Sequence, residues 1–215
     1  SPILLFYYAK IQVTSVGIDF FDYILSFEIA ALLFLIFAIV GIANAFNIID
    51  GFNGLLLSYC FGIALSILFN NQFVATAYEY TLDLMAVILG LLLFNFFGKI
   101  FMGDAGAYML GIIISSGVIV LQQNNDYSPW YVFLIFIYPV TEVLTSIIRK
   151  VFIRNRSALE PDGLHFHMLI YKRLSKKIGF RRLRLRHFLV TLTLFILNMP
   201  FLMAANLFAS EQNIL

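Results

Sequence analysis

The amino-acid sequence predicts an all-α fold, a polytopic bundle of transmembrane helices. Of the 215 residues, 61% are hydrophobic and only 12% are charged, and the mean hydropathy is +0.92. A soluble domain usually carries about a quarter charged residues. Apolar runs long enough to cross a bilayer as a helix, about 20 residues, recur along the whole chain. The composition therefore excludes a soluble domain and predicts one integral membrane domain over residues 1–215.

Seven apolar runs mark the expected helices. The first is short, at residues 2–17, and contains Lys10, whose charged end can reach an interface. The sequence therefore predicts six or seven helices in this chain. Cys60, the single cysteine, lies inside one of the runs and indicates no function by itself. The six longer runs lie at roughly 28–46, 53–69, 81–98, 107–122, 130–148 and 188–208.

The positive charge is concentrated in one segment. All but two of the 14 Lys and Arg residues fall between Arg149 and Arg186, the exceptions being Lys10 and Lys99. The positive-inside rule makes residues 149–187 a basic cytoplasmic loop. Counting helices outward from this loop places the two other polar motifs on the same face. We therefore expect three polar motifs to meet at the cytoplasmic membrane surface.

The first motif, NAFNIIDGFNGL, begins at Asn44 and interrupts an apolar run. Asn44, Asn47 and Asp50 share one helix face, and two glycines permit a tight turn before the next helix. Asp50 or Asn53 alone would be explained as a helix cap. Capping does not explain Asn47 and Asn44, one and two turns deeper, where unpaired polar groups would cost several kcal/mol. The pattern therefore favours a functional site.

The second motif, NFFGKIFMGDAGAYMLG, places Lys99 and Asp104 among glycines at a membrane surface. Glycine lets a ligand approach the backbone, a lysine can pair with phosphate, and an aspartate can hold a hard metal ion. The alternative is that Asp104 only caps the start of a helix. The motif alone favours neither interpretation. Together with Asp50 it indicates a Mg²⁺ site.

The third motif, PDGLHFHML, lies in the basic loop. Glu160 and Asp162 precede His165 and His167 within dense positive charge. A histidine pair without cysteine or further ligands is a weak zinc pattern. Basic loops also commonly set topology or contact anionic lipid. Many cations beside a carboxylate-bound divalent metal suit a di- or triphosphate better than zinc, and we therefore expect an anion site.

A further acid lies inside an apolar run. Glu142 follows Pro139 and precedes Arg149 by seven residues. An acidic residue within a membrane helix costs about 2.5–3.5 kcal/mol on insertion scales and indicates function by default. Glu28 and Asp83, in contrast, lie near the outer ends of their runs and can reach water. Glu142 is therefore the additional candidate.

Phosphoryl transfer between a soluble nucleotide and a lipid phosphate suits these parts. A divalent metal and a cationic loop offset the charge of both reactants, and apolar helices hold the lipid chain. An ion-coupled transporter is the alternative, since it also uses acids inside the membrane. A transporter needs its polar groups near the midplane, whereas these cluster at one interface. The residues therefore favour an enzyme.

The three motifs, in this order and on this side, closely resemble the polyprenyl-phosphate N-acetylhexosamine-1-phosphate transferase family, glycosyltransferase family 4. The resemblance covers residues 44–168 and includes PVTEVLTSIIRK before the histidine motif. The form of that motif is more similar to the branch that initiates O-antigen and common-antigen chains than to the peptidoglycan lipid I translocase. The resemblance implies transfer of N-acetylhexosamine 1-phosphate from a UDP-sugar to undecaprenyl phosphate, with release of UMP, at the cytoplasmic face of the bacterial inner membrane.

The resemblance also implies roles for individual residues. Asp50 and Asp104 are expected to be catalytic, with Asp104 a ligand of Mg²⁺, for which Mn²⁺ is an alternative. The expected partners are a UDP-N-acetylhexosamine, undecaprenyl phosphate and the lipid bilayer, without nucleic acid. The sugar, the final polymer and a homo-oligomeric state stay open. The expected substrate-binding residues are Asn44, Asn47, Lys99, Arg149, Asp162, His165 and His167.

Members of this family carry an Asp-Asp pair in an earlier cytoplasmic loop, and this sequence contains no such pair. On the resemblance, the chain is expected to be the C-terminal two thirds of the family fold, a fragment without that loop. A noncatalytic remnant of the enzyme is accordingly the second hypothesis, and the transporter is the third.

Overall fold

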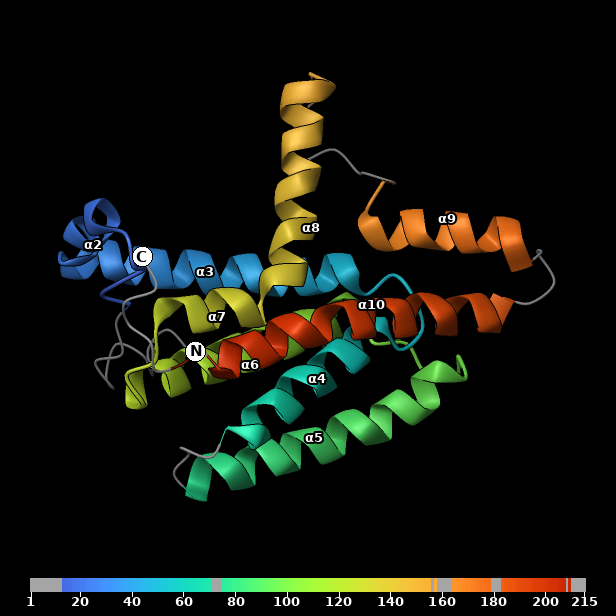
Figure 1. Ribbon diagram of the computed structural model, residues 1–215, viewed down its shortest axis with the longest axis horizontal. Helices are drawn as coiled ribbons and strands as arrows, with labels where there is room; N and C mark the ends of the chain where they lie inside the picture. Colours follow the sequence, from blue (N-terminus) through green and yellow to red (C-terminus); the bar gives the residue numbers. More distant parts are fainter. Residues whose placement is uncertain are drawn as a thin grey trace.

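The computed structural model describes residues 13–70, 75–155, 157, 164–178, 183–207 and 209, and its regular secondary structure within these ranges is helical, without strands. This confirms the predicted all-α fold. Figure 1 shows that most helices run side by side along the long axis, whereas α8 stands across them. The helices are α2 (Asp19–Leu25), α3 (Glu28–Ile49), α4 (Leu55–Phe69), α5 (Ala75–Phe96), α6 (Gly103–Asn124), α7 (Pro129–Ile135), α8 (Ile137–Ile148), the π-helical η1 (Arg149–Ile153), α9 (Phe166–Ile178) and α10 (Leu183–Leu207).

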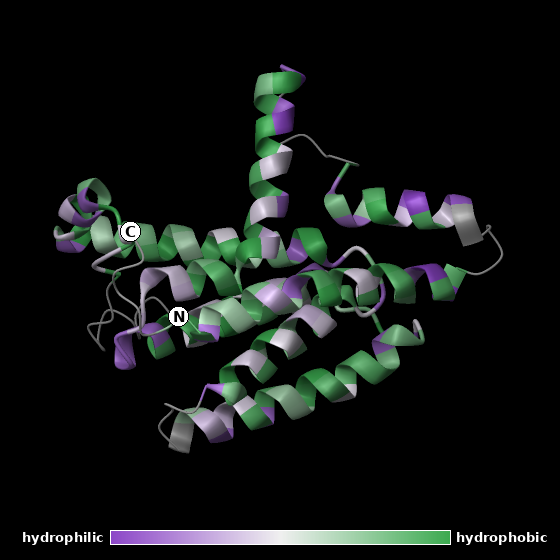
Figure 2. Ribbon diagram, in the orientation of Figure 1, coloured by the Kyte–Doolittle hydropathy of each residue, from purple (hydrophilic) through white to green (hydrophobic). Residues whose placement is uncertain are grey.

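Among the described residues, four helices, α3, α5, α6 and α10, are long and apolar enough to cross a membrane. Figure 2 shows hydrophobic residues over most of their length. The bent pair of α7 and α8–η1 adds a fifth span if it is counted as one, whereas α4 has only 15 residues. The chain is therefore a multi-pass membrane protein. The helices expected at 28–46, 53–69, 81–98, 107–122 and 188–208 are all present, and the run at 2–17 lies largely outside the described residues.

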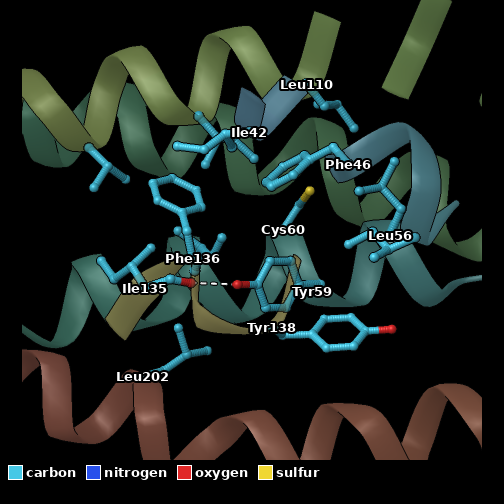
Figure 3. Packing of buried hydrophobic residues seen from close by; sticks show 14 of the residues in the cluster. Ile42, Phe46, Leu56, Tyr59, Cys60, Leu110, Ile135, Phe136, Tyr138 and Leu202 are labelled. Atoms are coloured by element: carbon cyan, nitrogen blue, oxygen red, sulfur yellow. Dashed lines mark hydrogen bonds between the residues drawn. The ribbon is translucent and has the colours of Figure 1, made fainter. Parts of the chain in front are cut away.

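Helix α4 forms the buried centre of the bundle. Eleven of its 15 residues are buried, and it contacts both α5 and α10. Figure 3 shows Tyr59 and Cys60 of α4 among Phe46 of α3 and Leu110 of α6. Lipid tails are as apolar as these side chains, so a close fit between helices, rather than removal from water, favours their association in a bilayer. Such a core can hold the helix ends, and the polar loops on them, in defined positions.

The run expected as one helix at roughly 130–148 is helical but divided, because the chain bends by 75° between α7 and α8 at Phe136. Pro139 has no N–H to donate to the carbonyl of Ile135, four residues earlier, so a regular helix cannot continue through this point. The hydroxyl of Tyr59 donates a hydrogen bond to that carbonyl instead (Figure 3). The carbonyl thus stays paired, as a membrane interior requires, and α8 turns sideways out of the bundle.

The polar motifs gather at one end of the bundle, on the right in Figure 1. This end carries the turn between α3 and α4, the segment between α5 and α6, helix α9 and the start of α10. The basic loop predicted at 149–187 is partly helical, since it contains η1 and α9, and α10 begins at Leu183 rather than near residue 188. The three motifs that the topology placed on one face therefore lie at the same end of the bundle.

Candidate active site

A close contact between α3 and α6 sets the positions of Asp50 and Asp104 along the axis of the bundle. A Cβ on Gly111 of α6 would lie only 2.6 Å from the Cα of Ala43 in α3, so the contact requires glycine. Asp50 follows Ala43 by seven residues, and Asp104 precedes Gly111 by seven. The two helices run in opposite directions, so about two turns on each bring both carboxylates to the same level at the end of the bundle.

Asp50 and Asp104 are close enough to interact as like charges. Burial and, to a smaller extent, the charge of Asp104 raise the pKa of Asp50 from its ordinary value of 3.8 to about 6. Asp50 lies directly after the membrane-spanning part of α3, at the residue where the helix ends. A carboxyl group with a raised pKa beside a second carboxylate is typical of a functional site.

Neither aspartate caps a helix start. Helix α4 begins after Gly54, whose φ of 79° favours glycine, and no side chain caps it. Helix α6 begins after Met102, also without a side-chain cap, and Asp104 is the second residue of that helix. The capping alternative that the sequence left open is therefore wrong for both acids.

Asn47 and Tyr108 extend the acidic pair along the same face. Asn47, about one turn before Asp50, donates a hydrogen bond from its side-chain amide to the Tyr108 hydroxyl at 3.3 Å. Tyr108 lies one turn after Asp104, is 38% exposed, and keeps its own hydroxyl hydrogen for another acceptor. Asn44, a further turn back, is exposed. The sequence analysis missed Tyr108, because an aromatic residue in an apolar run carries no functional signal of its own.

Glu142 of α8 holds the histidine motif against the bundle. Its side chain is 2% exposed, and its oxygens accept hydrogen bonds from the backbone N–H groups of Phe166 (2.8 Å) and His167 (3.1 Å). The Nδ1 atoms of His167 and His165 lie 3.0 Å and 3.6 Å from the same carboxylate. Phe166 and His167 begin α9, so a carboxylate of α8 caps the N-terminus of α9. Glu142, outside the expected substrate-binding set, therefore organises this motif.

The two histidine rings are stacked, and that of His167 reaches the turn after Asp50. Their centroids are 5.4 Å apart and their planes differ by 6°. His167 is fully buried, and a Cβ on Gly51 would lie 3.1 Å from its Nε2. Because Nδ1 of His167 faces Glu142, the other ring nitrogen faces this turn. The histidine motif and the first acidic motif, more than a hundred residues apart in the sequence, therefore meet here.

Phe52, in the same turn, joins α9 to α10. Its ring stacks on Tyr171 of α9 at a centroid distance of 4.8 Å and meets the edge of His187 of α10 at 5.1 Å. The guanidinium of Arg186 lies 5.2 Å from the Tyr171 ring centre and donates to Ser175. Aromatic pairs of this kind each contribute about 0.5–1.5 kcal/mol beyond burial. The turn that follows Asp50 is thus anchored to the basic segment.

The remaining expected residues lie at the margin of this cluster or outside the described part of the chain. Lys99 is exposed, with its Nζ 6.0 Å from the centre of the Phe94 ring. Arg149 follows Glu142 by seven residues, about 10 Å farther along α8. Asp162 lies outside the described residues. The expected residues that the fold brings together are Asn47, Asp50, Asp104, His165 and His167.

The donor set suits Mg²⁺ better than zinc. Within the described ranges, no group of three or more His, Cys, Asp or Glu side chains is placed to hold a metal ion. Zinc usually needs three or four such ligands, whereas Mg²⁺ is commonly held by one or two carboxylates, water and phosphate oxygens. Asp50 and Asp104 supply two carboxylates whose repulsion a cation would relieve. These residues therefore fit a Mg²⁺ ion that is also bound by substrate phosphates.

Comparison with known proteins finds a family and several relatives. Residues 1–122 match the sequence model of a family described as glycosyl transferase family 4. The chain is 26% identical over 177 residues to the undecaprenyl-phosphate alpha-N-acetylglucosaminyl 1-phosphate transferase of Thermotoga maritima, a match that covers 79% of this chain and 55% of the relative. It is 31% identical over 158 residues to the phospho-N-acetylmuramoyl-pentapeptide-transferase of Thermotoga petrophila, covering 71% and 51%. The chain thus spans about half the length of these curated relatives.

Proposed function

The chain belongs to glycosyl transferase family 4, and from this premise we propose that it transfers an N-acetylhexosamine 1-phosphate from a UDP-sugar to undecaprenyl phosphate, releasing UMP. The name of one relative describes a sugar 1-phosphate transferase acting on undecaprenyl phosphate, and that of another a phospho-N-acetylmuramoyl-pentapeptide transferase. Initiation of O-antigen or a similar surface polysaccharide, at the cytoplasmic face of the inner membrane, is the setting we propose.

The observation that carries the proposal is that an acidic pair and a histidine pair meet at one end of an apolar bundle. Asp50 interacts electrostatically with Asp104, and the turn after Asp50 touches the buried ring of His167. A reaction between two phosphates needs both kinds of group: carboxylates for a divalent cation and hydrogen-bond donors for phosphate oxygens. An apolar bundle beside them suits a lipid acceptor.

Each residue has a role in this proposal. Asp104 would be a ligand of Mg²⁺, and Asp50 would be the second carboxylate beside it. When bound, Mg²⁺ would offset the charge of the donor diphosphate and of the departing UMP. The residues that would contact the nucleotide, the sugar or the phosphates are Asn44, Asn47, Lys99, Tyr108, Arg149, Asp162, His165 and His167.

Helix α8 and η1 provide an apolar surface for the polyprenyl chain. Only one stripe of α8 is buried, formed by Tyr138, Pro139, Glu142 and Ser146, and η1 has no buried residue. This stripe contains the Glu142 carboxylate, so a lipid lying along the exposed faces of the helix would bring its phosphate near the histidines that Glu142 contacts. The large apolar side chains exposed on the other faces are Leu144, Ile147, Ile148, Val151, Phe152 and Ile153.

Release of UMP tests the proposal. Membranes holding this chain, and a version extended by any in-frame upstream coding sequence, are given undecaprenyl phosphate, Mg²⁺ and a panel of UDP-N-acetylhexosamines. We expect Asp104→Asn to lower turnover at least 100-fold at unchanged membrane insertion, because it removes the proposed metal ligand. Asp83→Asn, an exposed aspartate on α5, is the matched control and should leave turnover unchanged.

The outcomes separate the hypotheses. Unchanged UMP release by the Asp104→Asn variant would refute the role of Asp104 as a metal ligand. If neither version releases UMP with any donor, although both are inserted in the membrane, the result would favour a noncatalytic remnant.

A further inference from the structure

We propose that Asn95, in the last turn of α5, is a positioning residue that holds the Asp50 turn and the segment leading to Asp104 at a set distance from each other. The inference rests on the proposed function, because it assigns this distance to the binding of the divalent cation. Asn95 was not among the residues expected from the sequence. It is the first residue of the second motif, to which the sequence analysis gave no role, and it is 5% exposed.

One side-chain amide joins the two loops. The Oδ1 of Asn95 accepts a hydrogen bond from the backbone N–H of Gly54 at 2.5 Å, and its Nδ2 donates to the backbone carbonyl of Ile100 at 2.9 Å. Gly54 closes the turn that follows Asp50, and Ile100 lies in the segment before Asp104. Both hydrogen bonds are thus made by one planar group, which permits little change in the distance between the two backbones.

The spacing along the chain makes this link relevant to both acids. Gly54 follows Asp50 by four residues, and Ile100 precedes Asp104 by four. A shift of either backbone segment therefore moves a carboxylate. Mg²⁺ demands near-ideal octahedral geometry, with ligands at about 2.0–2.1 Å, and a buried hydrogen bond is electrostatically stronger than one in water. Asn95 consequently sets the separation of the carboxylates without touching substrate.

The end of α5 is built to present this amide. Gly98, with a φ of 65°, ends the helix, and its N–H donates to the carbonyl of Asn95 while the N–H of Lys99 donates to the carbonyl of Phe94. This pair of bonds is the Schellman arrangement, which stops a helix at a defined residue. The last turn, and Asn95 within it, therefore has one conformation.

The neighbouring contacts leave the turn little freedom. A Cβ on Gly54 would lie 2.4 Å from a carbon of the Phe96 ring, so the turn lies directly against the end of α5. On the other side, the Thr191 hydroxyl of α10 donates to the carbonyl of Asn53 at 3.0 Å. The Asp50 turn is thus held between α5 and α10, and Asn95 is the residue that connects it to the Asp104 segment.

Binding of Mn²⁺, measured by electron paramagnetic resonance on the purified protein in detergent, tests the inference without substrate. Asn95→Leu keeps the side-chain volume and removes both hydrogen bonds; we expect it to bind Mn²⁺ at least fivefold more weakly and to lose hydrogen-exchange protection at Gly54. Asn95→Gln retains an amide on a longer side chain and supplies a second variant if the first does not fold. We expect Asn95→Gln to fold like the wild type and still bind Mn²⁺ more weakly.

The matched control is Asn206→Leu. The Asn206 amide joins α10 to the carbonyl of Ser66 in α4 at 2.7 Å, in the opposite half of the bundle. This variant should lose stability without losing Mn²⁺ affinity. Equal Mn²⁺ affinity in every folded Asn95 variant, or a wild type that binds no Mn²⁺, would overturn the inference. A wild type that binds Mn²⁺ but releases no UMP would refute only the proposed function, and the comparison of Asn95 variants would still decide this question.

Discussion

Asp50 and Glu142 are acidic residues at the same end of the bundle, and their surroundings are opposite. Glu142 is buried and accepts hydrogen bonds from two backbone N–H groups, with the ring nitrogen of His167 at 3.0 Å. Asp50 is half-buried, faces the like charge of Asp104 and has a raised pKa. One carboxylate is surrounded by donors, whereas the other is held beside a second negative charge.

This difference indicates that Glu142 stabilises the fold, whereas Asp50 is placed to bind a ligand. A buried charge with complete hydrogen bonding fixes the groups around it, here the start of α9 and two histidines. Two carboxylates held together without a cation raise the free energy of the folded state, and this cost persists only where the surrounding structure imposes it. Substitutions should therefore affect the two regions in opposite ways.

The largest expected effect is at Glu142, the acid that accepts hydrogen bonds. Glu142→Leu removes the acceptor for the first N–H groups of α9 and leaves a buried histidine without its partner. We expect the free energy of unfolding to fall by about 3–5 kcal/mol, as when one partner of a buried polar pair is removed. Denaturant unfolding in detergent micelles measures it. The control is Glu28→Leu, an exposed position in the first turn of α3, which should stay within about 0.5 kcal/mol of the wild type; equal losses in both variants would show that Glu142 is not a special contact.

A smaller loss of stability is expected at Gly111, where the contact between α3 and α6 positions the two aspartates. Gly111→Ala puts a methyl group against the Ala43 backbone and pushes α3 from α6; such overpacking typically costs about 1–3 kcal/mol. UMP release should fall with it, because Asp50 and Asp104 move apart, while the contacts of Glu142 remain. Gly117→Ala on the same helix has nothing within 4 Å of its new Cβ and should stabilise by about 0.5–1 kcal/mol. Stability equal to that of the wild type in Gly111→Ala would contradict the register argument.

The smallest expected effect is a pH dependence at Asp50. The pKa of Asp50 is about 6 in the folded protein, against 3.8 ordinarily, so the folded state favours the protonated form. Its stabilising contribution is complete below pH 3.8 and is lost as the pH rises through 6. In the presence of a chelator, the Tm of the wild type should therefore fall between pH 4 and 7 relative to that of Asp50→Asn.

Added Mg²⁺ should restore the wild-type Tm at pH 7 and have little effect near pH 4, where the proton occupies the site. The Asp83→Asn variant is the control and should follow the wild type. Parallel Tm curves for the wild type and Asp50→Asn would show that the folded state does not raise the pKa of Asp50.

Much of the candidate site was predictable from short stretches of sequence. Asn47, Asp50 and Asp104 stand out because polar groups inside apolar runs are costly and rare. His165 and His167 stand out within a basic segment. Asn95 also lies in an apolar run, but its role and that of Tyr108 could not be predicted in this way. Those roles depend on partners that only the fold defines: Asn47 for Tyr108, and the backbones of Gly54 and Ile100 for Asn95.

By itself the sequence determined that the chain is helical, that it lies in a membrane and that its polar motifs share one end. Hydropathy and charge act over whole segments and need no knowledge of which atoms touch. Only the tertiary structure decided that the chain bends at Phe136, that Glu142 holds the histidines and that Gly111 sets the level of the two aspartates. These features depend on single contacts between residues far apart in the chain, and only the packed helices define such contacts.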